Sequence, residues 1–169
     1  MEHKQLQPDE AEALMRALLI GSEISTFEYW ADFIIRLERD VSRDSRQQLI
    51  GGAPSALWLR LEAEWRVGDQ KHWDAKQASF PIQELRHFTT RNAPMKAAVI
   101  AQMVGSTITN IKVSSDGILE IETSDDVTLS VRGVSNSHDY SWSIERRDDE
   151  FHVTEMVIHC EPDGRLFGR

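Results

Sequence analysis

One segment of this chain occurs twice. Residues 20–38 align without a gap on residues 104–122, so that one constant offset relates every aligned pair. Six aligned positions hold the same residue in both segments: Gly21/Gly105, Ser22/Ser106, Ile24/Ile108, Asp32/Asp116, Ile34/Ile118 and Glu38/Glu122. Self-similarity at a fixed spacing indicates a repeated structural unit. We therefore predict two copies of one unit, residues 1–92 and 93–169, packed into one compact domain.

The residues around the two segments predict the same elements in the same order. A proline, Pro8 or Pro94, precedes helix-forming residues with apolar spacing. Each expected helix ends at a glycine, Gly21 or Gly105, which can adopt the left-handed conformation that closes a helix. Two strands follow in each copy, separated by a turn that contains an aspartate. The predicted fold is α+β: a duplicated unit of one helix and an antiparallel meander, with the copies forming a continuous sheet or a half-barrel.

Residues 24–37 fit two secondary structures. Four apolar side chains would share one face of a helix: Phe27, Ala31, Ile34 and Leu37. The matching segment of the second copy contains Ser115, Asp116 and Gly117, a sequence typical of a hairpin turn, between residues rich in Ile and Val. We therefore expect strands in both copies, with a long loop over residues 39–56 after the second strand of the first copy.

The clearest strand covers residues 57–67. Apolar residues alternate there with Trp58, Arg60, Glu62, Glu64 and Arg66. This alternation predicts one buried face and one solvated face. We expect Trp65 and Trp142 at related core positions of the two copies. A last strand is expected over residues 151–160, followed by a turn at residues 162–164 and a frayed end.

The charge of the chain disfavours several kinds of partner. The net charge is −9, and residues 93–169 carry 7 basic and 13 acidic side chains against 12 and 15 in residues 1–92. An acidic surface repels phosphate groups, so we expect neither nucleic acid nor membrane as a partner, whereas a basic protein would be attracted. The single cysteine, Cys160, rules out a disulfide within the chain, and no apolar run approaches the ~20 residues that span a bilayer. We expect a cytoplasmic protein.

The sequence contains no motif of catalysis or cofactor binding. It lacks a glycine-rich phosphate loop, a nucleophile elbow and metal-ligand spacing. His159 and Cys160 are adjacent on an expected strand, so they would point to opposite faces and could not hold one ion. Asp32 and Asp116 either pair between the copies or each cap their own turn, which we favour. We expect no catalytic residue, no cofactor and no metal, with Cys160 as a small buried residue.

The surface residues point instead to protein binding. Six residues are predicted to contact a partner: Asp148, Asp149, Glu150, Glu62, Glu64 and Trp58. The first three form an acidic corner, and the others lie on the solvated face of residues 57–67. Aromatic anchors inside a charged rim are typical of binding hot spots, which makes Trp30 and Trp73 further candidates. The alternative for each tryptophan is packing beneath a loop or against the sheet.

The order of elements also resembles that of known bacterial proteins. The chain resembles bacterial domains of unknown function in the order of its features. These are a helix, the pattern Gly-Ser-x-Ile, an aspartate turn, an alternating strand that ends in Trp65-Arg66-Val67 and a second Gly-Ser-x-Ile-Thr copy. The chain also resembles, in its general sequence character, small α+β immunity proteins of contact-dependent and polymorphic toxin systems. The resemblance covers residues 14–67 and 98–145. It implies a bacterial origin and an inhibitor role, and it assigns no functional residue.

These observations predict a non-catalytic module that binds or inhibits another protein, immunity-like, through an acidic surface. Two other classes of function stay open. One is a small-ligand-binding or homodimerising module, with a pocket between the copies or a paired edge strand. The other is an enzyme whose residues are dispersed along the sequence.

Overall fold

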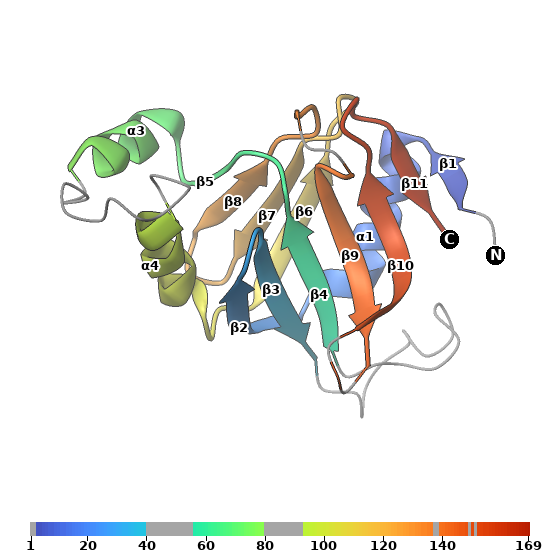
Figure 1. Cartoon of the computed structure of the whole chain (residues 1–169), viewed down its shortest axis with the longest axis horizontal. Coiled ribbons are helices and arrows are strands. Elements are labelled where there is room, and N and C mark those ends of the chain that lie inside the picture. The colour runs from blue at the N-terminus through green and yellow to red at the C-terminus, as the bar shows by residue number, and fades with distance from the viewer. Residues whose placement is uncertain (1–2, 40–55, 80–92, 137–138, 149, 151) are drawn as a thin grey trace.

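A computed structural model of the chain describes residues 3–39, 56–79, 93–136, 139–148, 150 and 152–169. This part of the chain forms two antiparallel sheets and three helices, an α+β fold as expected (Figure 1). The large sheet has the strand order β1 (Lys4–Leu6), β11 (Leu166–Gly168), β10 (Val153–Cys160), β9 (Trp142–Arg147), β4 (Ala56–Leu61), β3 (Phe33–Glu38) and β2 (Glu23–Tyr29). The small sheet has the order β5 (Trp65–Val67), β8 (Thr128–Val131), β7 (Leu119–Thr123) and β6 (Ile108–Val113). The helices are α1 (Pro8–Leu19), α3 (Gln70–Ser79) and α4 (Ala93–Met103).

Both sheets and the helices contribute to one hydrophobic core. Helix α1 packs against β6 and β11, and α4 packs against β2. Helix α1 begins at Pro8, where the Glu10 carboxylate accepts the backbone N–H of Gln7 at 2.9 Å. It ends before Gly21, which has φ +81° as the sequence predicted. Within the described residues, no helix is long and apolar enough to cross a membrane.

The chain crosses from one sheet to the other after β4 and again after β8. Strand β4 pairs with β3 in the large sheet, but β5, which follows it directly along the chain, pairs with β8 in the small sheet. Strand β9, which follows β8, returns to pair with β4. The single strand predicted over residues 57–67 is therefore wrong: it breaks at residues 62–64, where the backbone N–H groups of Glu62 and Ala63 donate to the Ser141 carbonyl. Both sheets combine strands from the two halves of the chain.

Backbone hydrogen bonds join the two halves in matching pairs, at the offset that the sequence alignment predicted. Four such bonds link the starts of β2 and β6: Gly21 to Ile108 (2.9 Å), Gly105 to Ile24 (2.8 Å), Ile24 to Ser106 (2.9 Å) and Ile108 to Ser22 (2.8 Å), with the N–H donor named first. An isolated bridge between Glu23 and Thr107 lies among them. Trp65 begins β5 and pairs with Val131, and Trp142 begins β9 and pairs with Leu61. Each tryptophan therefore begins the first strand after one of the two crossings between the sheets. The internal duplication itself stays a prediction.

The gapless alignment fails after the turn. Ile24 pairs with Leu37, which the alignment matches to Ile121. The partner of Ile108 is instead Thr123, two positions further along the chain. The second hairpin therefore has a longer turn, which includes Gly117 at φ +74°. Identities that the alignment placed beyond this turn, such as Glu38/Glu122, do not occupy equivalent sheet positions.

Other expectations have mixed outcomes. Residues 24–37 form β2 and β3, so the choice of strands over a helix is confirmed. The end of the chain is not frayed, because β11 pairs with both β10 and β1. Helix α3 and strand β1 were not anticipated. Most of the long loop expected over residues 39–56 lies outside the described residues.

Candidate functional site

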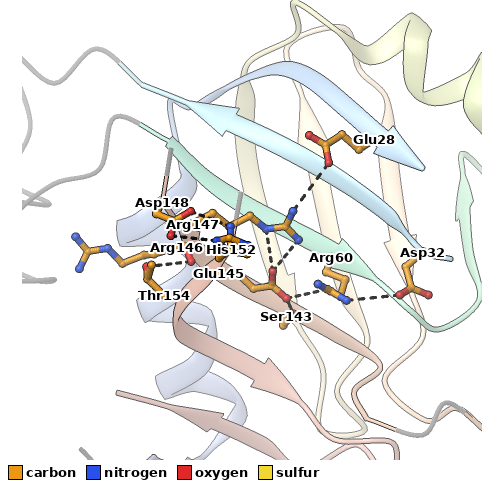
Figure 2. A network of polar contacts seen from close by, with 10 residues as sticks. All are labelled: Glu28, Asp32, Arg60, Ser143, Glu145, Arg146, Arg147, Asp148, His152 and Thr154. Atoms are coloured by element: carbon orange, nitrogen blue, oxygen red, sulfur yellow. Dashed lines mark hydrogen bonds and ion pairs between the residues drawn. The ribbon is translucent and has the colours of Figure 1, made fainter. Parts of the chain in front are cut away.

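The outer face of the large sheet carries a polar network rather than a row of solvated side chains (Figure 2). Alternate residues of β3, β4 and β9 point away from the core, and their register places them side by side. Trp58 lies opposite Glu145 on β9 and Arg36 on β3. Arg60 lies opposite Ser143 on β9.

The Glu145 carboxylate is the centre of this network. Its side chain is 2% exposed. One oxygen accepts hydrogen bonds from Arg60 Nε at 2.8 Å and Ser143 Oγ at 2.9 Å. The other accepts from Arg147 Nε at 3.2 Å and Nη2 at 3.0 Å. Because a buried charge is tolerated only when it is paired and hydrogen-bonded, these four bonds explain how Glu145 can lie there.

Arg147 extends across the sheet over Trp58. Its guanidinium carbon lies 5.6 Å from the centre of the Trp58 ring, and its Nη1 lies 4.0 Å from Glu28 Oε2 on β2. The Arg36 guanidinium lies 5.1 Å from the same ring. These cation–π contacts help to leave Trp58 only 7% exposed. Trp58 therefore packs within the outer layer of the sheet and is not a surface anchor.

A shallow pocket of about 260 Å³ opens on this face. We call it the Trp30 pocket, and its lining residues are Trp30, Ala31, Asp32, Ile34, Arg60, Arg147 and Val153. Trp30 is 81% exposed, and Val153 is 45% exposed. Among the described residues, only two other large hydrophobic side chains are exposed, Val104 and Val134. The Trp30 pocket thus combines an unburied tryptophan with apolar and charged walls.

Carboxylates gather near Arg60, and one of them, Asp32, lines the pocket. Asp32 Oδ2 lies 3.7 Å from Arg60 Nη1, and Glu62 accepts the backbone N–H of Tyr140 at 3.4 Å. Burial raises the pKa of Asp32, which Arg60 only partly offsets, and the charge of Asp139 raises it further. Burial likewise raises the pKa of Glu62, with Asp32 and Asp139 adding to the effect. The positive charge near these two carboxylates therefore does not fully offset the cost of burying them in the ionised form.

Five carboxylates lie in the region around the Arg60 and Arg147 guanidinium groups. Arg60 and Arg147 supply the positive charges. The carboxylates are those of Glu28, Asp32, Glu62, Asp139 and Glu145. We name the acidic rim as Glu28, which lies beside Arg147, together with Asp32, Glu62 and Asp139, whose charges act on one another near Arg60. Arg36, which lies over Trp58, adds a third guanidinium group to this face and pairs with Glu38.

The structure places the five described residues of the six predicted contacts in different surroundings. Asp148 caps the β9–β10 turn, where its carboxylate accepts the backbone N–H groups of Glu150 and His152, which lower its pKa. Glu150 is exposed, and Asp149 lies outside the described residues. Glu62 joins the acidic rim.

The remaining predicted tryptophan and glutamate positions also differ from the expectation. Glu64 points elsewhere, with its Oε2 3.9 Å from Lys96 of α4. Trp58 is buried as described above, and Trp73 is buried on α3 against Trp65. Of the tryptophans proposed as anchors, Trp30 alone is exposed.

Sequence reasoning missed Arg60, Glu145 and Arg147 as members of a site. Arg60 and Glu145 are far apart along the chain, and the three residues meet only because β9 crosses back to pair with β4. No local spacing in the sequence announces that crossing. The alternation of residues 57–67 did place Arg60 on the outer face.

The candidate reactive groups show no catalytic arrangement within the described residues. Cys160 is fully buried, and burial raises the pKa of its thiol to about 12, which leaves little thiolate for nucleophilic attack. Asp32 lies by Arg60, whereas Asp116 accepts the Ser114 hydroxyl in its own turn, so the two do not pair. No group of three His, Cys, Asp or Glu side chains there could hold a metal ion.

Comparison of the chain with protein-family models, with curated proteins and with solved structures finds no match in any of the three. Any function must therefore be argued from the geometry of the site.

Proposed function

We propose that this chain is a non-catalytic module that binds a basic segment of another protein on the outer face of its large sheet. The observation that carries the proposal is Trp30, which is 81% exposed at the edge of a pocket beside the acidic rim. An inhibitory, immunity-like role and a cytoplasmic location are part of the same proposal.

The apolar part of this face supports a protein partner. Exposing a tryptophan to water is unfavourable, because its large ring gives up the free energy of burial. Val153 lies in the same pocket and is also exposed, so an incoming chain would cover both side chains together. Tryptophan is among the residues most enriched at binding hot spots.

The charged part of this face supports a basic partner. The acidic rim belongs to a chain of net charge −9, whose field attracts positive charge over distances near the Debye length. Complementary charge mainly raises the association rate and suppresses wrong partners. The binding should therefore weaken as salt concentration rises.

Affinity capture tests the proposal. The full chain is immobilised and exposed to a lysate of its source cell at low salt, and bound proteins are eluted with rising salt and identified by mass spectrometry. We expect one stoichiometric basic protein, lost with Trp30→Ala and retained with the control Val134→Ala, since Val134 is exposed elsewhere.

Two outcomes would overturn the proposal. One is a partner that Trp30→Ala retains but that Asp148→Asn with Glu150→Gln loses, because the acidic corner would then be the binding face. The other is the absence of any protein whose capture depends on Trp30. Circular dichroism of each variant checks that its fold is intact.

A further inference from the structure

We infer that the Trp30 pocket receives a single cationic side chain, arginine or lysine, from the bound protein. This inference rests on the proposed function and names what the pocket takes. It follows from the size of the pocket, from the surroundings of the Asp32 carboxylate and from the groups that line the walls.

The size of the pocket limits what can enter. A volume of about 260 Å³, open on one side, cannot admit a helix, which with its side chains is about 10–12 Å across. One extended side chain fits the space. The rest of the partner would then lie on the rim, where Trp30 and Val153 are exposed.

The Asp32 carboxylate can accept hydrogen bonds that Arg60 does not supply. Its side chain is 28% exposed, and its ion pair with Arg60 spans 3.7 Å, longer than a hydrogen bond. The Arg60 guanidinium donates through Nε to Glu145 at 2.8 Å, so Arg60 is shared between two carboxylates. A cation that entered the pocket would supply Asp32 with short charge-assisted hydrogen bonds.

The other walls suit the rest of a cationic side chain. Ala31, Ile34 and Val153 present carbon to its methylene groups, as long charged side chains require. The exposed indole of Trp30 can stack on a guanidinium or ammonium group, a contact worth about 0.5–1 kcal/mol at an exposed site. The same geometry already occurs in this face, where Arg36 and Arg147 lie over Trp58.

Other occupants fit less well. An anion would meet Asp32, and the Arg147 guanidinium in the pocket wall already donates twice to Glu145. An apolar side chain would remove water from Asp32 without replacing its hydrogen bonds, which is costly for a charged group. Both guanidinium groups of the lining, Arg60 and Arg147, donate to Glu145, so Asp32 is the charged lining group left to pair with an incoming cation.

Titration with small probes tests this inference without the natural partner. N-acetyl-argininamide and N-acetyl-lysinamide are added to the ¹⁵N-labelled full chain, and the indole and backbone N–H signals of Trp30 are followed by NMR. We expect saturable shifts at Trp30 and Ala31. N-acetyl-norleucinamide, which has a similar stem without the charge, should cause none at the same concentration.

A matched pair of carboxylate variants locates the contact. Asp32→Asn should weaken binding of the arginine probe about tenfold, as expected for loss of a charge-assisted bond. Glu150→Gln removes an exposed carboxylate of the β9–β10 turn and should leave binding unchanged. Thermal unfolding of both variants checks that each remains folded.

Two results would overturn the inference: no saturable shift at Trp30 with either cationic probe, or a response that Asp32→Asn leaves intact. If either occurs while Trp30→Ala still abolishes protein capture, the proposed function stands and only the occupant of the pocket is wrong. If the probes bind but no Trp30-dependent protein is captured, the pocket is a cation site and the proposed function fails.

Discussion

The guanidinium carbon of Arg147 lies 5.6 Å from the centre of the Trp58 ring. The alternation of residues 57–67 predicts that this face of the sheet is solvated. The contact belongs instead to a packed outer layer on that face. Arg147 is held in place by two hydrogen bonds to Glu145, so the ring, the cation and the buried carboxylate depend on one another. The Trp30 pocket opens over this packed layer, which provides a firm base for binding.

Trp58 and Trp30 should have opposite roles in stability and binding. Trp58→Ala removes a buried ring and should lower the free energy of unfolding by about 3–5 kcal/mol. Trp30→Ala removes an exposed ring and should change it by less than about 0.5 kcal/mol. Urea denaturation followed by circular dichroism measures both. Equal losses in the two variants would contradict the burial difference on which the site rests.

Glu145 should be the most sensitive polar position of this face. Glu145→Gln leaves the guanidinium groups of Arg60 and Arg147 without their buried counter-charge and should cost about 3–5 kcal/mol of stability. Glu150→Gln, at an exposed carboxylate, should cost less than about 0.5 kcal/mol. Urea denaturation at neutral pH compares the two. A Glu145→Gln variant as stable as the unmodified chain would show that the network contributes nothing to folding.

Local signals predicted the elements better than their arrangement. Pro8 and Gly21 marked the limits of α1, and the alternation at residues 57–61 marked the inner face of β4. The same alternation continues through Ala63 and Trp65, which are buried, although the chain has by then passed to the other sheet. Alternation of apolar and polar residues indicates which side chains are buried, but it does not indicate which sheet a strand joins. The sequence therefore contained no sign of the crossing between the sheets.

The site could be predicted only in part for the same reason. Trp30 was a candidate because aromatic anchors inside a charged rim are typical of binding hot spots. Its neighbour Arg60 comes from the separate strand β4, and Arg147 arrives by the second crossing. Helix α3 was missed because Trp73 is its only buried residue, which gives no helical periodicity.

His159 should make stability depend on pH. It is 8% exposed, and burial together with the nearby His3 lowers its pKa to about 4, below the ordinary 6.5. The rings of His3, Tyr140 and Phe167 surround it. As pH falls from about 6.5 to about 4, this histidine binds a proton in the unfolded chain but not in the folded chain. The folded state therefore loses about 3 kcal/mol of stability.

Replacing the histidine tests this effect. His159→Phe should remove that part of the stability loss between pH 6.5 and pH 4, measured as the difference in unfolding free energy from the unmodified chain at each pH. His152→Gln, at an exposed histidine, should keep it. An unchanged pH profile in His159→Phe would mean that this imidazole titrates normally.

Binding at the Trp30 pocket should also depend on pH, with its sign set by Asp32. Burial raises the pKa of Asp32 in the free protein, and a cation seated beside it would lower that pKa again. The carboxylate must be ionised to hold the cation, so binding is present above the raised pKa and weakens as pH falls through it. The affinity of N-acetyl-argininamide, measured by NMR at a series of pH values, should therefore fall on acidification in the unmodified chain. In Asp32→Asn the affinity should be low throughout and vary much less with pH. A profile that Asp32→Asn does not flatten would show that Asp32 does not hold the cation.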